Sequence, residues 1–196
     1  LPISSALSGT LQCARMVKEN GGYDNVYLYD SRCTTLMLEL LVREAAKRAE
    51  TLSIEELIAF VDDLRSRAHL LAGIDTLEYL AKGGRLNTAT AAIGSLLRVK
   101  PIITIGDGGT IDVIGKKMGS KTAVRELCGM VNLNKIDPEY GIRFLYSMRD
   151  ANVRELIVRM GLEPETVLEL QDIGPVIGTH IGPDAFGYVY VDRKEE

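Results

Sequence analysis

A cluster of hydroxyl side chains lies just before an expected helix near the start of the sequence. It consists of Ser4, Ser5, Ser8 and Thr10, with the flexible Gly9 among them. Amides at the beginning of a helix are free to donate hydrogen bonds, and the helix dipole favours negative charge there. The pattern therefore predicts a site that holds a carboxylate or phosphate. The alternative is an ordinary helix cap with polar neighbours.

A second candidate is the run Lys82-Gly83-Gly84-Arg85, in which an arginine directly follows two glycines. A guanidinium is permanently charged, and its planar fork can bind a carboxylate or phosphate through two hydrogen bonds. We therefore expect Arg85 to contact an anionic ligand. The alternative is a glycine that ends a helix, followed by a solvated arginine.

The third candidate is His180, which stands between Gly178 and the pair Gly182-Pro183. Histidine is the side chain best suited to exchange a proton near neutral pH, and a glycine-rich turn would let a ligand approach it. The alternative is a histidine that only supports the turn. The other histidine, His69, lies at an element boundary without a partner motif and is expected to be structural.

Several familiar chemistries do not fit the sequence. The run from Gly115 to Thr122 has the wrong spacing for a phosphate-binding loop and should be an ordinary helix start. Neither a dinucleotide-binding Gly-x-Gly-x-x-Gly nor a nucleophile elbow Gly-x-Ser-x-Gly occurs. Two distant histidines and three widely spaced cysteines argue against zinc and against a disulfide framework. We therefore expect no metal and no cofactor.

The composition indicates an ordinary globular protein. The 196 residues are 46% hydrophobic, with 23 basic and 27 acidic side chains and a net charge of −4. This balance gives no general reason to bind nucleic acid, and no apolar run is long enough for membrane insertion. The unpaired cysteines favour a reducing cytoplasm. The first residues, Leu1 to Ser5, resemble the exit of a strand rather than a signal peptide, which suggests a fragment.

Local patterns predict an α/β arrangement for residues 1–68. We expect a helix that begins at Leu11 and ends at Gly21-Gly22, with Ala14, Met16 and Val17 on its covered side. Further elements are a strand over Val26–Tyr29, a helix over Thr35–Ala49, and a helix capped by Ser53 and Glu56 that runs to Ala68. These residues should form a partial first α/β domain.

Residues 69–196 are expected to form a second α/β domain with a largely antiparallel sheet, separated from the first near Ala68. The expected strands are His69–Ile74, Ile102–Ile105, Thr110–Ile114, Ile142–Ser147, Val167–Leu170 and Gly187–Val191, and Asp107-Gly108-Gly109 should turn the second and third into a hairpin. The expected helices are Thr76–Ala81, Ala89–Leu97, Thr122–Val131 and Asn152–Met160.

Taken together, these segments resemble the DegV family of fatty-acid-binding proteins. The resemblance rests on Pro2-Ile3-Ser4-Ser5-x-Leu7-Ser8-Gly9-Thr10, Asp30-Ser31, Thr76-Leu77-Glu78-Tyr79-Leu80-x-Lys82-Gly83-Gly84-Arg85, Lys100-Pro101-Ile102 and His180-x-Gly182-Pro183. This sequence departs from the family in one respect. Members of the family have a leading segment before the stretch that begins at Pro2, with further strands and a loop hydroxyl that helps to hold the carboxylate, and this sequence lacks it.

The resemblance implies a two-domain α/β protein that buries a long-chain fatty acid and holds its carboxylate in the cleft between the domains. It implies a binding subunit rather than an enzyme, with an ATP-dependent fatty acid kinase as partner. Ser5 and Ser8, with Gly9 and Thr10, would hold the carboxylate region, and Arg85 and His180 would lie near the head group.

The second domain would house the acyl tail. Candidate residues for an apolar tunnel are Leu71, Ile74, Leu77, Leu96, Ile103, Ile105 and Val113, with a plain hydrophobic core as the alternative. A different class of function also stays open at this point. The chain could be a self-contained hydrolase or phosphotransferase that uses Ser8 of the serine-rich loop and His180.

Overall fold

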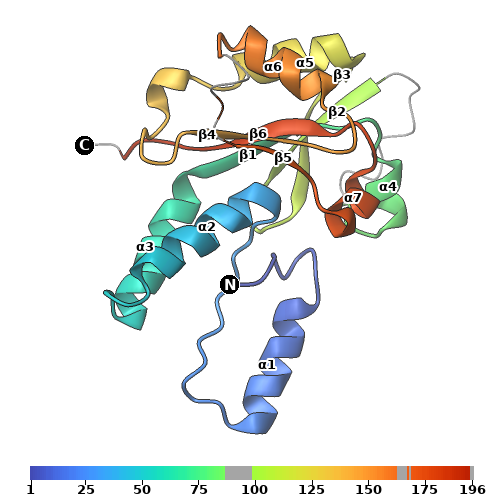
Figure 1. Ribbon diagram of the computed structural model, residues 1–196. Helices are drawn as coiled ribbons and strands as arrows, with labels where there is room; N and C mark the ends of the chain where they lie inside the picture. The colour runs from blue at the N-terminus through green and yellow to red at the C-terminus, as the bar shows by residue number, and fades with distance from the viewer. Residues whose placement is uncertain (87–98, 163–166, 168, 195–196) are drawn as a thin grey trace. The chain divides into compact units, whose positions relative to one another are not determined.

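The computed structural model describes residues 1–86, 99–162, 167 and 169–194 (Figure 1). The chain divides into two compact units. The first comprises Leu1–Ala68 and Ile105–Thr110, and the second comprises His69–Thr104 and Ile111–Glu196. The helix expected over Ala89–Leu97 lies outside the described residues.

The first unit contains the helices α1 (Thr10–Gly21), α2 (Thr35–Arg48) and α3 (Ile54–Arg67), and it confirms the three helices predicted there. The chain leaves α1 through Gly22, whose φ of 64° is the left-handed conformation that glycine adopts readily. At the start of α3 the predicted capping box is present. The Ser53 hydroxyl accepts from the Glu56 amide at 3.2 Å, and the Glu56 carboxylate accepts from the Ser53 amide at 2.9 Å.

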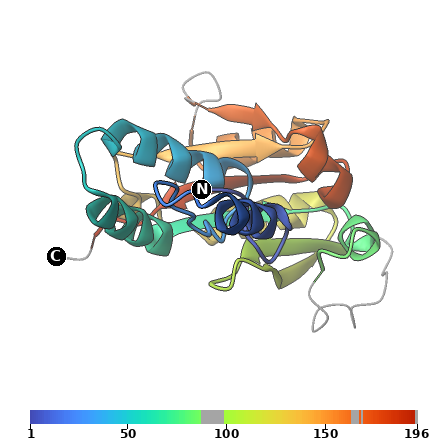
Figure 2. The same cartoon turned by 90° about the horizontal axis from the view of Figure 1, so that it is seen from below.

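Helices α2 and α3 pack against each other along apolar faces (Figure 2). Their buried hydrophobic residues are Leu36, Met37, Leu40, Leu41, Ala45, Val61 and Leu64. Helix α1 is different, because Leu11 is its one buried residue. Met16 and Val17 are 53% and 61% exposed, so the prediction that they cover one side of this helix is wrong.

The strand predicted over Val26–Tyr29 is also wrong. This segment is not part of a strand, and no described segment pairs with it. Its β-prone side chains satisfy the local pattern, but a strand also needs a neighbour to complete its backbone hydrogen bonds. The Tyr29 hydroxyl instead donates to the Asp62 carboxylate at 2.5 Å.

The second unit is built on one six-stranded sheet with the strand order β3-β2-β1-β6-β4-β5. Its strands are β1 (Ala68–Gly73), β2 (Val99–Ile105), β3 (Ile111–Met118), β4 (Ile142–Tyr146), β5 (Leu170–Asp172) and β6 (Phe186–Val191). Its helices are α4 (Glu78–Lys82), α5 (Ser120–Gly129), α6 (Ala151–Arg159) and α7 (Pro175–Ile181), and Leu133–Lys135 form a short 3-10 turn.

The registers confirm the predicted α/β class with a largely antiparallel sheet. Strands β1 and β2 are antiparallel with Ala72 opposite Ile103, and β4 and β6 are antiparallel with Phe144 opposite Tyr188. Strand β5 joins β4 in parallel. It begins at Leu170, where the predicted strand was expected to end.

The predicted hairpin is present between β2 and β3. Its turn is closed by hydrogen bonds from the Gly106 amide to the Thr110 carbonyl at 3.0 Å and from the Gly109 amide to the Gly106 carbonyl at 2.8 Å. Gly109 has a φ of 73°, which a residue with a side chain rarely adopts. Strand β3 continues to Met118, past the predicted end at Ile114, so the first four residues of the run from Gly115 belong to the strand. Gly119 then caps α5, and the rest of the run is the predicted ordinary helix start.

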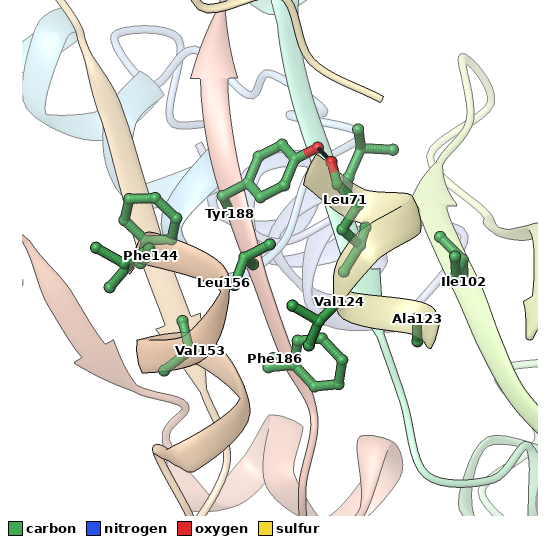
Figure 3. Close-up of a cluster of buried hydrophobic side chains, with 11 residues drawn as sticks. Leu71, Ile102, Ala123, Val124, Phe144, Val153, Leu156, Phe186 and Tyr188 are labelled. Atoms are coloured by element: carbon green, nitrogen blue, oxygen red, sulfur yellow. Dashed lines mark hydrogen bonds between the residues drawn. The ribbon is translucent and has the colours of Figure 1, made fainter. Parts of the chain in front are cut away.

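The core of the second unit lies between the sheet and the helices α5 and α6 (Figure 3). Its largest fully buried side chains include Phe144, Phe186, Tyr188, Leu127 and Leu156. The Tyr188 hydroxyl donates to the Leu127 carbonyl at 2.7 Å, the contact drawn as a dashed line in Figure 3.

The residues predicted to line an apolar tunnel are mostly buried. Leu71, Ile74, Leu77 and Ile103 are at most 9% exposed, Ile105 and Val113 are half-buried, and Leu96 lies outside the described residues. This burial suits a tunnel lining and a packed core equally, so the tunnel stays a prediction. Among the described helices none has the length and apolar character to cross a membrane.

Candidate functional site

The serine-rich loop of the first unit is anchored by Ser4, which is fully buried. Its amide donates to the Cys33 carbonyl at 2.9 Å, and its hydroxyl donates to the Gly109 carbonyl at 2.8 Å. Its own carbonyl accepts from the amides of Leu7 and Ser8 at 3.0 Å each. The loop therefore has a fixed backbone that positions the hydroxyls after Ser4.

Ser5 is tied to Asp30. Its hydroxyl donates to one carboxylate oxygen of Asp30, and its amide donates to the other at 3.1 Å. The Arg32 amide adds a further hydrogen bond at 3.1 Å. Partial burial raises the pKa of Asp30, but the hydrogen bonds from Ser5 and Arg32 outweigh it and hold the pKa below its ordinary value. Asp30 therefore stays ionised and directs the Ser5 hydroxyl toward itself.

Ser8, Gly9 and Thr10 form the entrance to α1. The hydroxyls of Ser8 and Thr10 lie 2.8 Å apart, and the Thr10 amide donates to the Ser8 hydroxyl at 3.3 Å. Gly9 is the N-cap residue and offers no side-chain cap, and the first turn of α1 contains no acidic residue. The half-buried Ser8 hydroxyl and the exposed Thr10 hydroxyl thus lie at a helix end that favours an anion.

Arg85 is positioned by the way α4 ends. Gly84 has a φ of 68° and donates its amide to the Ala81 carbonyl at 3.1 Å, and the Arg85 amide donates to the Leu80 carbonyl at 2.9 Å. This pair of bonds is the Schellman arrangement, which closes a helix through a left-handed glycine. The Arg85 guanidinium then folds back, and its Nη1 donates to the Gly83 carbonyl at 2.6 Å.

His180 lies in α7 and not in the glycine-rich turn that the sequence predicted. Pro175 occupies the first helical position, where its missing amide hydrogen costs nothing, and Gly182 follows the helix with a φ of 79°. Helices α4 and α7 lie side by side (Figures 1 and 2). The His180 ring lies against Gly83, the residue whose carbonyl Arg85 contacts. Gly83 therefore brings Arg85 and His180 together within the second unit.

These contacts suit the recognition of an anion. The first unit offers hydroxyls at a helix start, and the second offers a permanent positive charge and an imidazole that both contact Gly83, and these groups suit a carboxylate or phosphate. No group of three or more metal-ligating side chains occurs in the described parts of the chain. His69 pairs with Asp192 at 2.9 Å, apart from this arrangement.

Two residues with a clear part in this geometry were not predicted from the sequence as site residues. Asp30 belongs to the pair Asp30-Ser31 that contributes to the family resemblance, and an aspartate at a loop start often accepts backbone amides. Gly83 lies in a glycine pair that is typical of a helix end, and nothing in its local sequence indicates a contact with His180.

The chain was compared with known proteins. The family model described as "Uncharacterised protein, DegV family" matches residues 1–193. A DegV domain-containing protein of Caldanaerobacter subterraneus subsp. tengcongensis is 34% identical over 195 residues, covering 97% of this chain and 69% of the relative. One from Clostridium perfringens is 30% identical over 187 residues, covering 94% of this chain and 66% of the relative. The chain thus spans about two thirds of the length of these curated relatives.

Solved structures agree with the sequence matches. A fatty acid binding DegV family protein from Streptococcus agalactiae has a TM-score of 0.83 at 26% identity, with 98% of this chain and 69% of that chain covered. A fatty-acid-binding DegV family protein from Thermus thermophilus has a TM-score of 0.81 at 28% identity, with 97% and 69% covered. The Streptococcus pneumoniae Fatty Acid Kinase (Fak) B3 protein, loaded with linoleic acid, has the same fold, with a TM-score of 0.79 at 18% identity and 97% and 70% covered. The chain belongs to the DegV family.

Proposed function

We propose that this protein binds a long-chain fatty acid and presents its carboxylate to an ATP-dependent fatty acid kinase, which phosphorylates it to an acyl phosphate. The observation that carries the proposal is the convergence of Arg85 and His180 on Gly83, in a family with solved members that bind fatty acids. The protein acts as the lipid-binding subunit and has no complete catalytic apparatus of its own. Its working compartment is the cytoplasm, where ATP is available to the kinase.

The acyl tail supplies most of the affinity. Each methylene removed from water contributes about 0.8 kcal/mol, so a long chain binds tightly with few polar contacts. Residues 69–196 hold this tail, and residues 1–68 form the remainder of the first domain. The buried side chains of Leu71, Ile74, Leu77 and Ile103 support the apolar character that this role requires.

Each unit offers donors that suit an anionic head group. In the first unit these are the hydroxyls of Ser8 and Thr10 with the free amides at the start of α1, where Gly9 is the N-cap and Ser5 supports the loop through Asp30. In the second unit they are Arg85 and His180. The neutral donors of the helix start suit a carboxylate at rest. The guanidinium matters most when a carboxylate oxygen attacks the γ-phosphorus of ATP and negative charge accumulates on the transferring phosphoryl group. The kinase supplies ATP and Mg²⁺, and ADP leaves with the kinase.

The alternative of a self-contained hydrolase is less well supported. A serine nucleophile needs a histidine that a third group, usually a carboxylate, holds in the correct orientation. The buried Nδ1 of His180 has no hydrogen-bond partner among the described residues. The Ser8 hydroxyl, moreover, pairs with the Thr10 hydroxyl at 2.8 Å, which is not a general base that could activate it.

The proposal is tested by mixing the purified protein with oleic acid and recording native mass spectra, followed by a coupled assay with a purified fatty acid kinase subunit and ATP. We expect a complex with one fatty acid and formation of oleoyl phosphate that depends on both proteins. Turnover by this protein alone would support the enzyme alternative. Absence of a fatty acid complex would refute the proposal.

A further inference from the structure

Helices α4 and α7 interlock through two glycines, each of which lies under an aromatic ring of the other segment. A Cβ atom added to Gly83 would lie 2.2 Å from Nδ1 of His180, and one added to Gly182 would lie 2.3 Å from the Tyr79 ring. Real Cβ atoms do not approach other heavy atoms so closely. The position of the His180 ring therefore depends on the absence of a side chain at Gly83.

The contact also determines what His180 Nδ1 can bind. Because a Cβ at Gly83 would point at Nδ1, the α-hydrogen that occupies that direction points at the same nitrogen. Nδ1 is fully buried and has no hydrogen-bond partner in the described chain. A bare nitrogen lone pair can accept a weak C–H contact, whereas a buried N–H without an acceptor is among the rarest features of folded proteins.

We infer that Gly83 is a positioning residue that favours the tautomer of the His180 ring with its proton on Nε2. A neutral imidazole carries one N–H, and the environment of Nδ1 disfavours placing it there. Of the two ring nitrogens of His180, only Nδ1 is both buried and without a partner among the described residues. The ring therefore presents an N–H donor, which suits a carboxylate or phosphate oxygen.

This inference rests on the proposed function for the identity of the acceptor, but the tautomer can be measured without any ligand. We would record long-range ¹H–¹⁵N spectra of ¹⁵N-histidine-labelled protein at about pH 8.5, where imidazoles are largely neutral. The two histidines are assigned with a His69→Gln variant. The expected result is a proton on Nε2 of His180, and a proton on Nδ1 would overturn the inference.

Gly83→Ala tests the role of the glycine. Gly83 has a φ of −76° and a ψ of −7°, which alanine adopts readily, so the main effect is the new Cβ against the ring, with a milder contact at 3.1 Å to the Tyr79 carbonyl. We expect a displaced ring with a mixture of tautomers. The matched control is Gly178→Ala in α7, where the nearest atom to a new Cβ is 4.0 Å away. Unchanged His180 spectra in Gly83→Ala would overturn the role of Gly83.

A pair of substitutions at His180 gives a readout that does not depend on the folding of Gly83→Ala. A glutamine amide can place an N–H near the position of Nε2, whereas an asparagine amide places it near Nδ1. We expect His180→Gln to retain about 10-fold more kinase-coupled turnover of oleic acid than His180→Asn. Equal turnover, or higher turnover with asparagine, would overturn the inference. Failure of wild-type protein to bind oleic acid would refute the proposed function and leave the measured tautomer as the test of the positioning.

Discussion

The carboxylate of Asp30 accepts hydrogen bonds from both the hydroxyl and the backbone amide of Ser5, which lies 25 positions earlier in the sequence. This double contact ties the serine-rich loop to the segment before α2. The hydroxyl hydrogen of Ser5 therefore points to Asp30 and is not available to a ligand. Ser8 and Thr10 share one contact between two hydroxyls, so one hydroxyl hydrogen of that pair can point to a ligand.

We expect Asp30→Asn to lower the free energy of unfolding by about 1 kcal/mol at pH 7, since it weakens charge-assisted hydrogen bonds in a partly exposed site. The folded pKa of Asp30 is lowered from 3.8. Its contribution to stability is therefore present above 3.8 and is lost as the pH falls through the lower, folded pKa. Urea unfolding at pH 7 and near pH 2.5 should show the difference between wild type and variant shrinking in acid. Asp24→Asn serves as control, because Asp24 is exposed. If wild type and Asp30→Asn differ in unfolding free energy as much at low pH as at pH 7, the ionised Asp30 is not the source of the stabilisation.

Ser8→Ala should weaken fatty acid binding about 5-fold to 10-fold, as expected for loss of one hydrogen bond to a charged head group. Ser5→Ala should instead act mainly on stability, because its hydroxyl donates to Asp30. Displacement of a fluorescent fatty acid and urea unfolding, run on both variants, separate these effects. The reverse pattern would show that Ser5 is the ligand contact.

Features set by neighbouring residues could be predicted from the sequence. The capping box of Ser53 and Glu56, the end of α1 at Gly22 and the hairpin turn around Gly109 depend on local backbone chemistry, and all three are present. The strand expected over Val26–Tyr29 failed because pairing depends on a distant partner that local pattern cannot supply. Helix α7 was missed because Gly178 and the flanking Gly174 and Gly182 made the segment look like a turn.

The candidate site shows the same division. The residue types that could bind an anion were evident in the sequence, and Ser5, Ser8, Gly9, Thr10, Arg85 and His180 stay predictions until ligand binding is measured. The contacts that orient them were not evident. Asp30 and Gly83 act through partners far away in the sequence, which periodicity and spacing do not specify.

Tyr188→Phe should destabilise the second unit by about 1 kcal/mol, the typical contribution of one buried hydrogen bond. The substitution removes the hydroxyl that donates to the Leu127 carbonyl at 2.7 Å, while the Met130 amide still donates to that carbonyl at 3.2 Å. Tyr190→Phe is the matched control, since no hydrogen bond of the Tyr190 hydroxyl occurs in the described chain. Urea unfolding followed by circular dichroism measures both variants. Equal effects of the two substitutions would show that the Tyr188 hydroxyl contributes nothing specific.

Arg85→Ala should lower kinase-coupled turnover of oleic acid by about 10-fold or more while changing its affinity less. Burial of the acyl tail supplies most of the binding free energy and is the same in both proteins, whereas the guanidinium acts on charge that develops during phosphoryl transfer. Arg85→Lys should restore only part of the turnover, because an ammonium lacks the planar fork.

Lys82→Ala is the control, since Lys82 is a neighbouring cation that pairs with Glu78 at 2.6 Å on an exposed surface. Affinity is measured by fatty acid displacement and turnover by formation of oleoyl phosphate with saturating kinase. Equal losses of affinity and turnover in Arg85→Ala would mean that Arg85 anchors the carboxylate at rest and does not act on the transferring group.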